Sequence, residues 1–467
     1  MNQPASLAAD IEHSTSLYER RRKLYVRSVS GFFAKWRWAL VWLTQAIFYG
    51  LCWLPWNGRQ AVLFDLVERK FYIFGLVFWP QDVLYLAVLL IISAYALFLF
   101  TAVGGRLFCG YACPQTVYTE IFMWMEEKIE GDRNARMKLD KQPLDGRKLA
   151  IKAAKHGAWI GFSLWTGFTF AAYFTPVDTL ARDLAGFRLG PWQTFWIFFY
   201  AFATYGMAGF MREQVCKYMC PYARFQSVMF DPDTLIVTYD AKRGEPRGVR
   251  SKKADPRGLG DCVDCGICVQ VCPTGIDIRK GLQYECIGCS ACIDGCDQVM
   301  DKLGAPRGLI RYSTENAMEQ NFGRAEIVAH LVRPRILLYT AVLVAITAAA
   351  AYSIAVRLPL KVDVIRDRGV LAREVEGGLI ENVYTLRIMN TDEKPHRYRI
   401  GVAGLEGIAL ADAGETEVGA ASTQSLVISA RVPPEAAGRG SQPIHFDIEA
   451  LEDKAIRLKE KAVFMMP

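Results

Sequence analysis

Five long apolar stretches dominate the hydrophobic pattern of the chain, and each approaches the roughly 20 residues that a helix needs to cross a bilayer. Almost no charge interrupts them, which argues against the buried helices of a large soluble enzyme. Tryptophans lie at their edges, as in the aromatic belt of membrane proteins. The pattern predicts membrane-spanning helices at residues 36–56, 83–103, 158–176, 192–211 and 336–356.

The last part of the chain has a different pattern, in which apolar and polar residues alternate over short runs. Such alternation predicts half-buried β-strands. Turn-forming residues separate the runs, and neither His396 nor His445 has a neighbour at metal-ligand spacing, so both are interpreted as surface residues. Short strands over roughly a hundred residues predict a disulfide-free β-sandwich. The predicted strands are residues 382–389, 397–402, 425–432 and 444–448.

Basic residues predict the orientation of the spans, because cytoplasmic loops carry an excess of lysine and arginine. The run Glu19-Arg20-Arg21-Arg22-Lys23 precedes the first span, so the N-terminus is predicted to be cytoplasmic. Segments 104–157 and 212–335 are then cytoplasmic, and the tail after the fifth span is periplasmic. No cysteine follows Cys296, so the exported part holds no thiol. The net charge of +7 follows from this topology, and we expect no nucleic-acid partner.

Eight of the thirteen cysteines fall in two runs, each spaced C-x2-C-x2-C-x3-C. This spacing is typical of two [4Fe-4S] clusters, in which the fourth cysteine of each run ligates the other cluster. A zinc module would use only C-x2-C pairs and leave half of these cysteines unexplained. Asp297 follows the second run, where proline is usual. The predicted ligands are Cys262, Cys265, Cys268 and Cys296 for cluster one, and Cys286, Cys289, Cys292 and Cys272 for cluster two.

Four more cysteines form two copies of a C-x3-C-P motif, Cys109 with Cys113 and Cys216 with Cys220, each at the cytoplasmic end of a predicted span. If the motif is helical, its two thiols share a face. If the proline instead begins a new helix, Cys113 and Cys220 lie at its positive end, where the pKa of a thiol is lowered. Ligands that are all sulfur select a soft ion such as Cu(I), or an iron-sulfur cluster. Plain packing is the alternative for these cysteines, and it is our interpretation of Cys52. Further candidate ligands are Met207, Met211, Met219 and His156.

Several stretches resemble the cytochrome c oxidase accessory protein family called CcoG, FixG or RdxA. They are residues 68–82, 109–116, 120–124, 128–134 and 137–141. The resemblance implies a polyferredoxin of the cytoplasmic membrane with a periplasmic immunoglobulin-like tail, active in maturation of the cbb-type cytochrome c oxidase. It also implies reduction of Cu(II) to Cu(I), with copper handled by Cys109, Cys113, Cys216 and Cys220.

The expected fold is therefore an α-helical membrane protein with five transmembrane helices, a cytoplasmic ferredoxin-like insert with two [4Fe-4S] clusters, and a periplasmic immunoglobulin-like β-sandwich. It is expected in the bacterial inner membrane, in contact with lipid. The expected domains are a cytoplasmic tail at 1–35, a four-helix region at 36–211 with its loop at 104–157, a cytoplasmic segment at 212–335 containing the ferredoxin at 255–310, the fifth helix at 336–357, and the sandwich at 358–467.

The expected function is that of an oxidoreductase, a cupric reductase that takes electrons from an unidentified cytoplasmic donor and passes them through the clusters to copper. Its expected partners are copper chaperones or a copper transporter, and oxidase assembly factors. Two alternatives stay open. One is a membrane redox-signalling relay that controls respiratory or photosynthesis genes. The other is a quinol-oxidising electron-transfer subunit, although the sequence contains no C-x-x-C-H haem-attachment motif.

Overall fold

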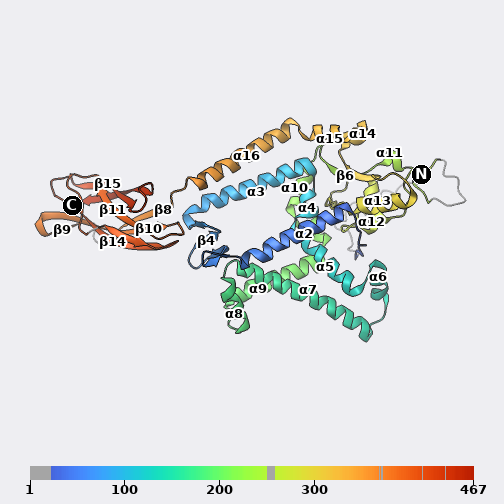
Figure 1. The fold of residues 1–467 in the computed structure, drawn as a ribbon, viewed down its shortest axis with the longest axis horizontal. Helices are drawn as coiled ribbons and strands as arrows, with labels where there is room; N and C mark the ends of the chain where they lie inside the picture. Colours follow the sequence, from blue (N-terminus) through green and yellow to red (C-terminus); the bar gives the residue numbers. More distant parts are fainter. Residues whose placement is uncertain (1–22, 250–257, 368, 370–371, 413, 437) are drawn as a thin grey trace, which may run out of the picture. The chain divides into compact units, whose positions relative to one another are not determined.

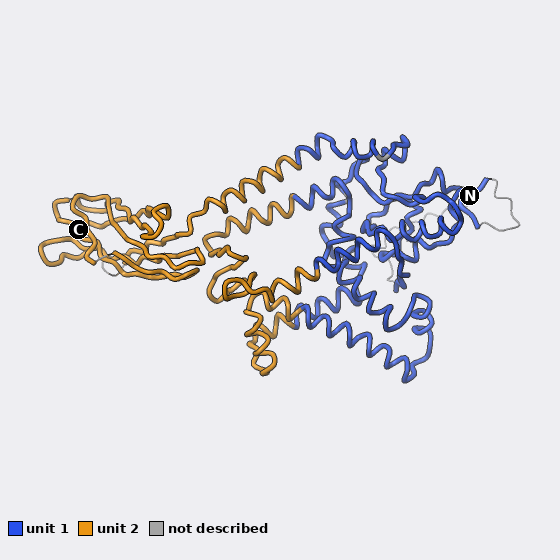
Figure 2. Tube along the Cα trace, in the orientation of Figure 1, with its two compact units in different colours: residues 1–44, 96–166, 198–339 blue, residues 45–95, 167–197, 340–467 orange. Residues whose placement is uncertain are grey.

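The computed structural model describes residues 23–467 except 250–257, 368, 370–371, 413 and 437 (Figure 1). The start of the predicted N-terminal tail and the first residues of the predicted ferredoxin domain thus lie outside the described residues. The chain forms two compact units (Figure 2). The first comprises Met1–Thr44, Ala96–Thr166 and Phe198–Tyr339, and the second comprises Gln45–Tyr95, Gly167–Ile197 and Thr340–Pro467.

Each of the five predicted spans is largely helical. The helices are α2 (Phe32–Gly50), α3 (Val83–Gly104), α7 (Gly146–Ala172), α9 (Pro191–Thr204) with the π-helix η3 (Tyr205–Met211), and α16 (Pro334–Ala355). Over the described residues, three segments are long and apolar enough to cross a membrane: Pro80–Gly104, Pro191–Met211 and Pro334–Ala355. The other two helices carry charges, such as Lys35 and Arg37 in α2 and Lys152 and Lys155 in α7. Five spans therefore stay a prediction.

The first predicted span ends early, and a small sheet follows it in the second unit. After Gly50 the chain makes a 3-10 turn (Leu51–Trp53) and the short strands β1 (Pro55–Trp56) and β2 (Arg59–Gln60). Three antiparallel strands follow in the order β3-β4-β5. The Gln60 amide nitrogen donates to the carbonyls of Val62 (2.7 Å) and Ala172 (2.8 Å), which ties this sheet to the end of α7. The sequence analysis missed these strands, β3 (Val62–Asp65), β4 (Lys70–Ile73) and β5 (Leu76–Phe78).

The rest of the first unit consists of shorter helices and one strand pair. In this pair, β6 (Ile236–Tyr239) lies antiparallel to β7 (Ile310–Ser313). The Asp294 carboxylate accepts hydrogen bonds from the backbone N–H groups of Phe33 (3.3 Å) and Ala34 (2.7 Å). It thereby caps the first turn of α2. The helices are α4 (Leu107–Tyr111), α5 (Pro114–Glu130), α6 (Arg133–Lys141), η4 (Val215–Met219), α10 (Pro221–Met229), α12 (Ile267–Gln270), α13 (Ala291–Leu303), α14 (Glu315–Gln320) and α15 (Arg324–Leu331).

The C-terminal part of the second unit is a two-sheet β-structure, so the predicted β-class of the tail is confirmed. One sheet has the order β12-β14-β10-β8 with β9 on β10, and the other has the order β13-β11-β15-β16. Tyr384 and Phe446, one from each sheet, are fully buried and pack at 5.1 Å between ring centroids. The strands are β8 (Leu360–Arg366), β9 (Arg373–Val375), β10 (Leu379–Asn390), β11 (His396–Ala403), β12 (Ala409–Leu410), β13 (Glu415–Val418), β14 (Thr423–Val432), β15 (Gly440–Ala450) and β16 (Arg457–Met466).

One prediction for this part was wrong. His396 is buried, not on the surface, and its Nε2 lies 3.0 Å from the Asp392 carboxylate. It begins β11, where alternate side chains enter the core.

Candidate iron-sulfur and thiolate site

The two cysteine runs fold into loops with the same backbone pattern. The second residue after Cys262 and the second after Cys286 both have positive φ, 51° at Asp264 and 65° at Gly288. Two residues further on, Gly266 (64°) and Ser290 (62°) also have positive φ, and they are the N-cap residues of α12 and α13. Such alternation turns successive N–H groups into a concave anion site, a form common around iron-sulfur clusters.

Each loop borders one cavity, and the two cavities are nearly equal in size. One, of about 360 Å³, is lined by Cys262, Cys265, Cys268 and Cys296. The other, of about 350 Å³, is lined by Cys272, Cys286, Cys289 and Cys292, and Cys268 also reaches it. In each cavity, three cysteines of one run meet the last cysteine of the other run. This is the crossed grouping that a two-cluster ferredoxin requires.

The chemistry of the cavities fits a cluster better than a single ion. Among the described residues, no three histidine, cysteine or acidic side chains lie close enough together to hold one metal ion. A cubane needs a wider arrangement, because each thiolate binds a different iron. Burial raises the pKa of Cys268 to about 11 and that of Cys296 to about 12. The thiolates are therefore unfavourable without metal, and binding cationic iron would release their protons.

The C-x3-C-P motifs have one of the two geometries expected from the sequence. Cys113 and Cys220 are the N-cap residues of α5 and α10, and Pro114 and Pro221 hold the first helical positions. The predicted lowering of the thiol pKa was wrong for Cys113. Burial raises the pKa of Cys113 and outweighs the backbone hydrogen bonds from Thr116 and Gln115. Desolvation of a buried charge thus exceeds the attraction of the helix N-terminus.

The fold brings the four motif cysteines together. Burial raises the pKa of Cys216 to about 12, and the nearby Cys113, Cys109 and Cys220 add to the shift. Burial also raises the pKa of Cys109 to about 11, although the buried Gln226 of α10 lies with its amide nitrogen 3.4 Å from the Cys109 sulfur. The two copies of the motif, about a hundred residues apart in sequence, form one thiol-rich site.

This thiol site contacts the loop of cluster two. Cys109 and Cys216 pack against a buried group that contains Ile287 and Cys289. A Cβ added to Gly110 would lie 2.8 Å from the Ile287 carbonyl oxygen and 2.9 Å from the Cys289 backbone nitrogen. Only glycine lets the motif approach so closely.

Hydroxyl groups and a shared cavity also connect the thiol site to the loop of cluster two. The Tyr111 hydroxyl, in the middle of the first motif, lies 3.2 Å from the Ser290 hydroxyl, which lies 2.6 Å from that of Tyr312. Cys216 and Cys289 line a common cavity of about 380 Å³. The thiol site and the loop of cluster two are therefore neighbours.

The Gly110 contact gives a testable prediction. We expect Gly110→Ala to slow electron transfer from the clusters to the thiol site and to destabilise the protein by about 1–3 kcal/mol, because the added methyl overpacks a tight contact. Gly161→Ala is the matched control, since a Cβ there meets nothing within 4 Å in the same unit. Thermal unfolding and the rate of cluster reoxidation measure the difference. Equal melting temperatures and equal reoxidation rates of the two variants would show that the Gly110 contact contributes neither to stability nor to electron transfer.

Comparison with known proteins decides the family. Three protein-family models match: a 4Fe-4S dicluster domain at residues 211–315, a 4Fe-4S binding domain at 86–131, and an IG-like fold at the C-terminus of FixG at 350–467. The chain is 38% identical to the nitrogen fixation protein FixG of Rhizobium meliloti over 432 residues, covering 85% of this chain and 82% of FixG. This chain belongs to the FixG family.

Other relatives agree with this placement. Protein RdxA of Cereibacter sphaeroides is 38% identical over 403 residues, covering 85% of each chain. The ferredoxin-type protein NapH of Haemophilus influenzae is 24% identical over 231 residues, covering 46% of this chain and 68% of NapH. The FixG-family chain is thus an iron-sulfur electron-transfer protein, and its apolar helices indicate a membrane protein.

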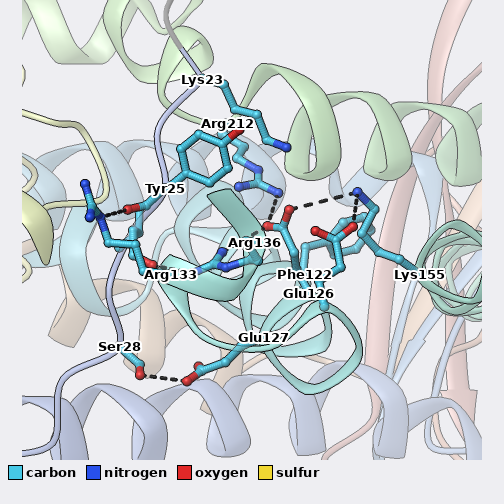
Figure 3. Close-up of polar contacts among 12 residues, drawn as sticks. Lys23, Tyr25, Ser28, Phe122, Glu126, Glu127, Arg133, Arg136, Lys155 and Arg212 are labelled. Atoms are coloured by element: carbon cyan, nitrogen blue, oxygen red, sulfur yellow. Dashed lines mark hydrogen bonds and ion pairs between the residues drawn. The ribbon is translucent and has the colours of Figure 1, made fainter. Parts of the chain in front are cut away.

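The sequence analysis missed a buried charge cluster in this FixG-family chain (Figure 3). Glu126 of α5 is 1% exposed and pairs with Arg212 (2.8 Å), Arg136 (3.4 Å) and Lys155 (3.9 Å). Glu130, one turn later, pairs with Lys155 at 3.0 Å. The acids and their partners come from four separate segments, so no local spacing could reveal the cluster.

The remaining sequence candidates have other roles. Cys52 is fully buried among apolar residues such as Phe168 and Leu180, and its interpretation as a packing residue is confirmed. His156 forms a hydrogen bond between its Nδ1 and the Tyr205 hydroxyl at 3.0 Å. Met207 and Met211 lie in η3, and Met219 ends η4, one residue before Cys220.

Proposed function

We propose that the protein carries electrons through two [4Fe-4S] clusters to the four-thiol site and there reduces Cu(II) to Cu(I). The clusters would be held by the two crossed cysteine sets, which the two cavities support. A cluster supplies a one-electron redox centre when bound. The observation that carries the proposal is the contact of Cys109 and Cys216 with Cys289, because it joins the cluster-two loop to the thiol site.

Copper suits these ligands and this step. Among the described residues no three cysteine, histidine or acidic side chains converge on one point, but two thiolates are enough to hold Cu(I). A bound cluster would supply one electron, which converts Cu(II) to Cu(I), so charge and electron count balance. Cu(I) prefers thiolate and thioether ligands, whereas Cu(II) prefers nitrogen and oxygen. Reduction therefore favours retention of the ion by sulfur. The raised pKa of Cys109 and Cys216 keeps both thiols protonated until a metal displaces the protons.

The test removes the thiols and leaves the clusters. Replacing Cys109, Cys113, Cys216 and Cys220 with serine is expected to abolish stoichiometric copper binding, because hydroxyls are hard, weak ligands for Cu(I). Iron content should match the wild type. Protein with reduced clusters should convert Cu(II) to Cu(I), detected with a Cu(I)-specific chelator, as the clusters reoxidise. The variant should fail in this conversion.

Cys52→Ser is the control, since Cys52 packs in the second unit. Loss of iron from the four-serine variant would indicate a third iron-sulfur cluster at the thiol site, in line with the 4Fe-4S binding model that matches residues 86–131. Unchanged copper binding and reduction would exclude the copper function and favour a redox-signalling relay.

We also propose that the cysteine-rich unit faces the cytoplasm and that the β-structure after α16 is periplasmic. The support is the basic character of the first unit near its helix ends and the absence of cysteine after Cys296. An alkaline phosphatase fused after Pro467 should be active, and one fused after Cys296 inactive. The reverse result would contradict this sidedness.

In this setting the acceptors of Cu(I) would be copper chaperones, a copper transporter or assembly factors of the cbb-type oxidase. Co-purification of copper-loaded protein with an oxidase assembly factor, lost in the four-serine variant, would support this role. Equal co-purification of the variant would contradict it.

A further inference from the structure

A fourth, larger cavity in the first unit lies outside the proposed copper site. With the open space at its mouth it has a volume of about 870 Å³, of which about 380 Å³ is accessible to water, within the range of small-ligand sites. Residues of α7 and η3 form half of its lining, and the other half is Lys23, Leu24, Glu126, Arg212 and Glu213. Its size and lining are those of a binding site for an organic molecule.

One side of the cavity is aromatic, and charged residues such as Lys23 and Lys155 line the rest. The rings of His156 and Phe210 are stacked, with centroids 6.0 Å apart and planes at 15°. Trp159 stands edge-on to both, at 5.3 Å from His156 and 6.3 Å from Phe210. Aromatic walls of this kind bind flat rings by stacking and edge contacts.

Two proton acceptors line the same cavity. Burial lowers the pKa of His156, with help from Lys155, so its ring is neutral at neutral pH. Glu213 is 7% exposed, and its carboxylate accepts a hydrogen bond from the Gln214 amide at 3.0 Å. Within the described part of the chain, no cation lies in ion-pair distance of Glu213. Its carboxylate can accept a hydrogen bond from a hydroxyl group of a bound ligand.

The backbone at the cavity is unusual. The π-helix η3 widens the end of α9, and Arg212 directly after it has φ of 42°. π-Helical turns and left-handed non-glycine residues concentrate at functional sites. Arg212 stays in place through its 2.8 Å ion pair with Glu126, visible in Figure 3, which also neutralises its charge beside the cavity.

The helix that leads to the cavity is apolar outside. Pro191–Met211 is one of the three segments fit to span a membrane, and Phe198, Phe199 and Phe202 are exposed on it within the first unit. A lipid-soluble ligand that follows α9 and η3 reaches the cavity at Gly209 and Phe210.

The cavity also adjoins the electron path. Arg212 and Glu213 line both this cavity and the one shared by Cys216 and Cys289. A redox ligand here would be separated from the cluster-two loop by these two residues.

From this arrangement we infer that the cavity binds and oxidises a membrane hydroquinone, which deepens the proposed function by naming its electron donor. The hydroquinone becomes a quinone: its two O–H bonds break, the protons pass to His156 and Glu213, and two electrons leave. Each of the two clusters accepts one of them. Copper takes one electron at a time, so the second cluster stores the other electron until the next Cu(II) arrives.

The test uses the full chain with its clusters, without oxygen, and a decyl-tailed benzoquinone that carries a photoreactive azide. Irradiation should label peptides that contain residues 205–213, and excess unlabelled decyl-benzoquinone should prevent the labelling. Labelling elsewhere, or labelling unaffected by the competitor, would overturn the inference. This readout needs no variant and no turnover.

Kinetics give the second readout. Decyl-benzohydroquinone should bleach the visible absorption of the clusters in the wild type. Glu213→Gln should lower the rate of this bleaching about 100-fold, because it removes a proton acceptor. Dithionite reduction should be unchanged. Glu127→Gln is the control, because Glu127 on the same helix as Glu126 bonds Ser28 at 2.7 Å and does not line this cavity. Equal rates in the two variants would contradict the inference.

The outcomes separate this inference from the copper proposal. If hydroquinone leaves the clusters oxidised while dithionite-reduced protein still reduces Cu(II), the donor is wrong and the copper function stands. If hydroquinone reduces the clusters but Cu(II) does not reoxidise them, the donor stands and the copper function fails.

Discussion

Replacing Cys272 with serine is expected to destroy the cluster whose other ligands lie in the second cysteine run, and replacing Cys296 should destroy the cluster of the first run. The two cavities group the cysteines in this crossed way. Metal binding is folding energy in small metal domains, on the order of 10 kcal/mol for structural sites. Each variant should therefore lose about half of its iron and loosen the loops around α12 and α13.

Paramagnetic resonance of the reduced protein measures this result, and each variant serves as the control for the other. Cys272→Ser should keep the signal that Cys296→Ser loses. Unaltered signals from two [4Fe-4S] centres in both variants would rule out the crossed assignment.

Glu126→Gln is expected to destabilise the first unit by about 3–5 kcal/mol, because it leaves buried positive charges without their partner. Arg212, Arg136 and Lys155 all pair with this carboxylate. Glu127→Gln, the same change one residue along α5, should cost no more than about 0.5 kcal/mol. Thermal unfolding in detergent, with iron content as a check on the clusters, compares the two. Equal melting temperatures would contradict the role of the charge cluster.

The pH dependence of the free energy of unfolding should also differ between the wild type and Glu126→Gln. Burial opposes ionisation of Glu126, but the charge and hydrogen bond of Arg212, with Arg136 and Lys155, outweigh it and lower the pKa. A lowered folded-state pKa gives stability that is present above the unfolded pKa and is lost as the pH falls through the folded value. The wild type should lose this contribution in acid, and Glu126→Gln should not show that loss.

The sequence predicted the parts of the site that depend on local spacing. The two cysteine runs follow from short motifs whose chemistry is local, and helices that begin at Pro114 and Pro221 were one of the two geometries that the motifs left open. Four strands of the C-terminal part follow from alternation, although β8, β9, β12, β13 and β16 were missed. In β16, charged residues such as Lys459 and Lys461 occupy the exposed positions and hide the pattern.

The parts that depend on tertiary packing could not be predicted. In the sequence nothing distinguishes Gly110 from other glycines, because its role depends on the Cys289 loop that lies against it in the fold. Helix position alone suggested an acidic thiol at Cys113, but the degree of burial decides the sign of the shift, and burial is a property of the fold. The charge cluster and the cavity beside His156 join residues from distant segments, so they appear only in three dimensions.

The two cysteine loops differ in their access to solutes. Cys265 is exposed in the first, whereas Cys289 in the second is 8% exposed and covered by Gly110. Dioxygen attacks iron-sulfur centres that it can reach. Inactivation in air should therefore proceed in order, with the outer centre lost first, and aerobically purified samples would then retain the inner centre, the one that contacts the thiols.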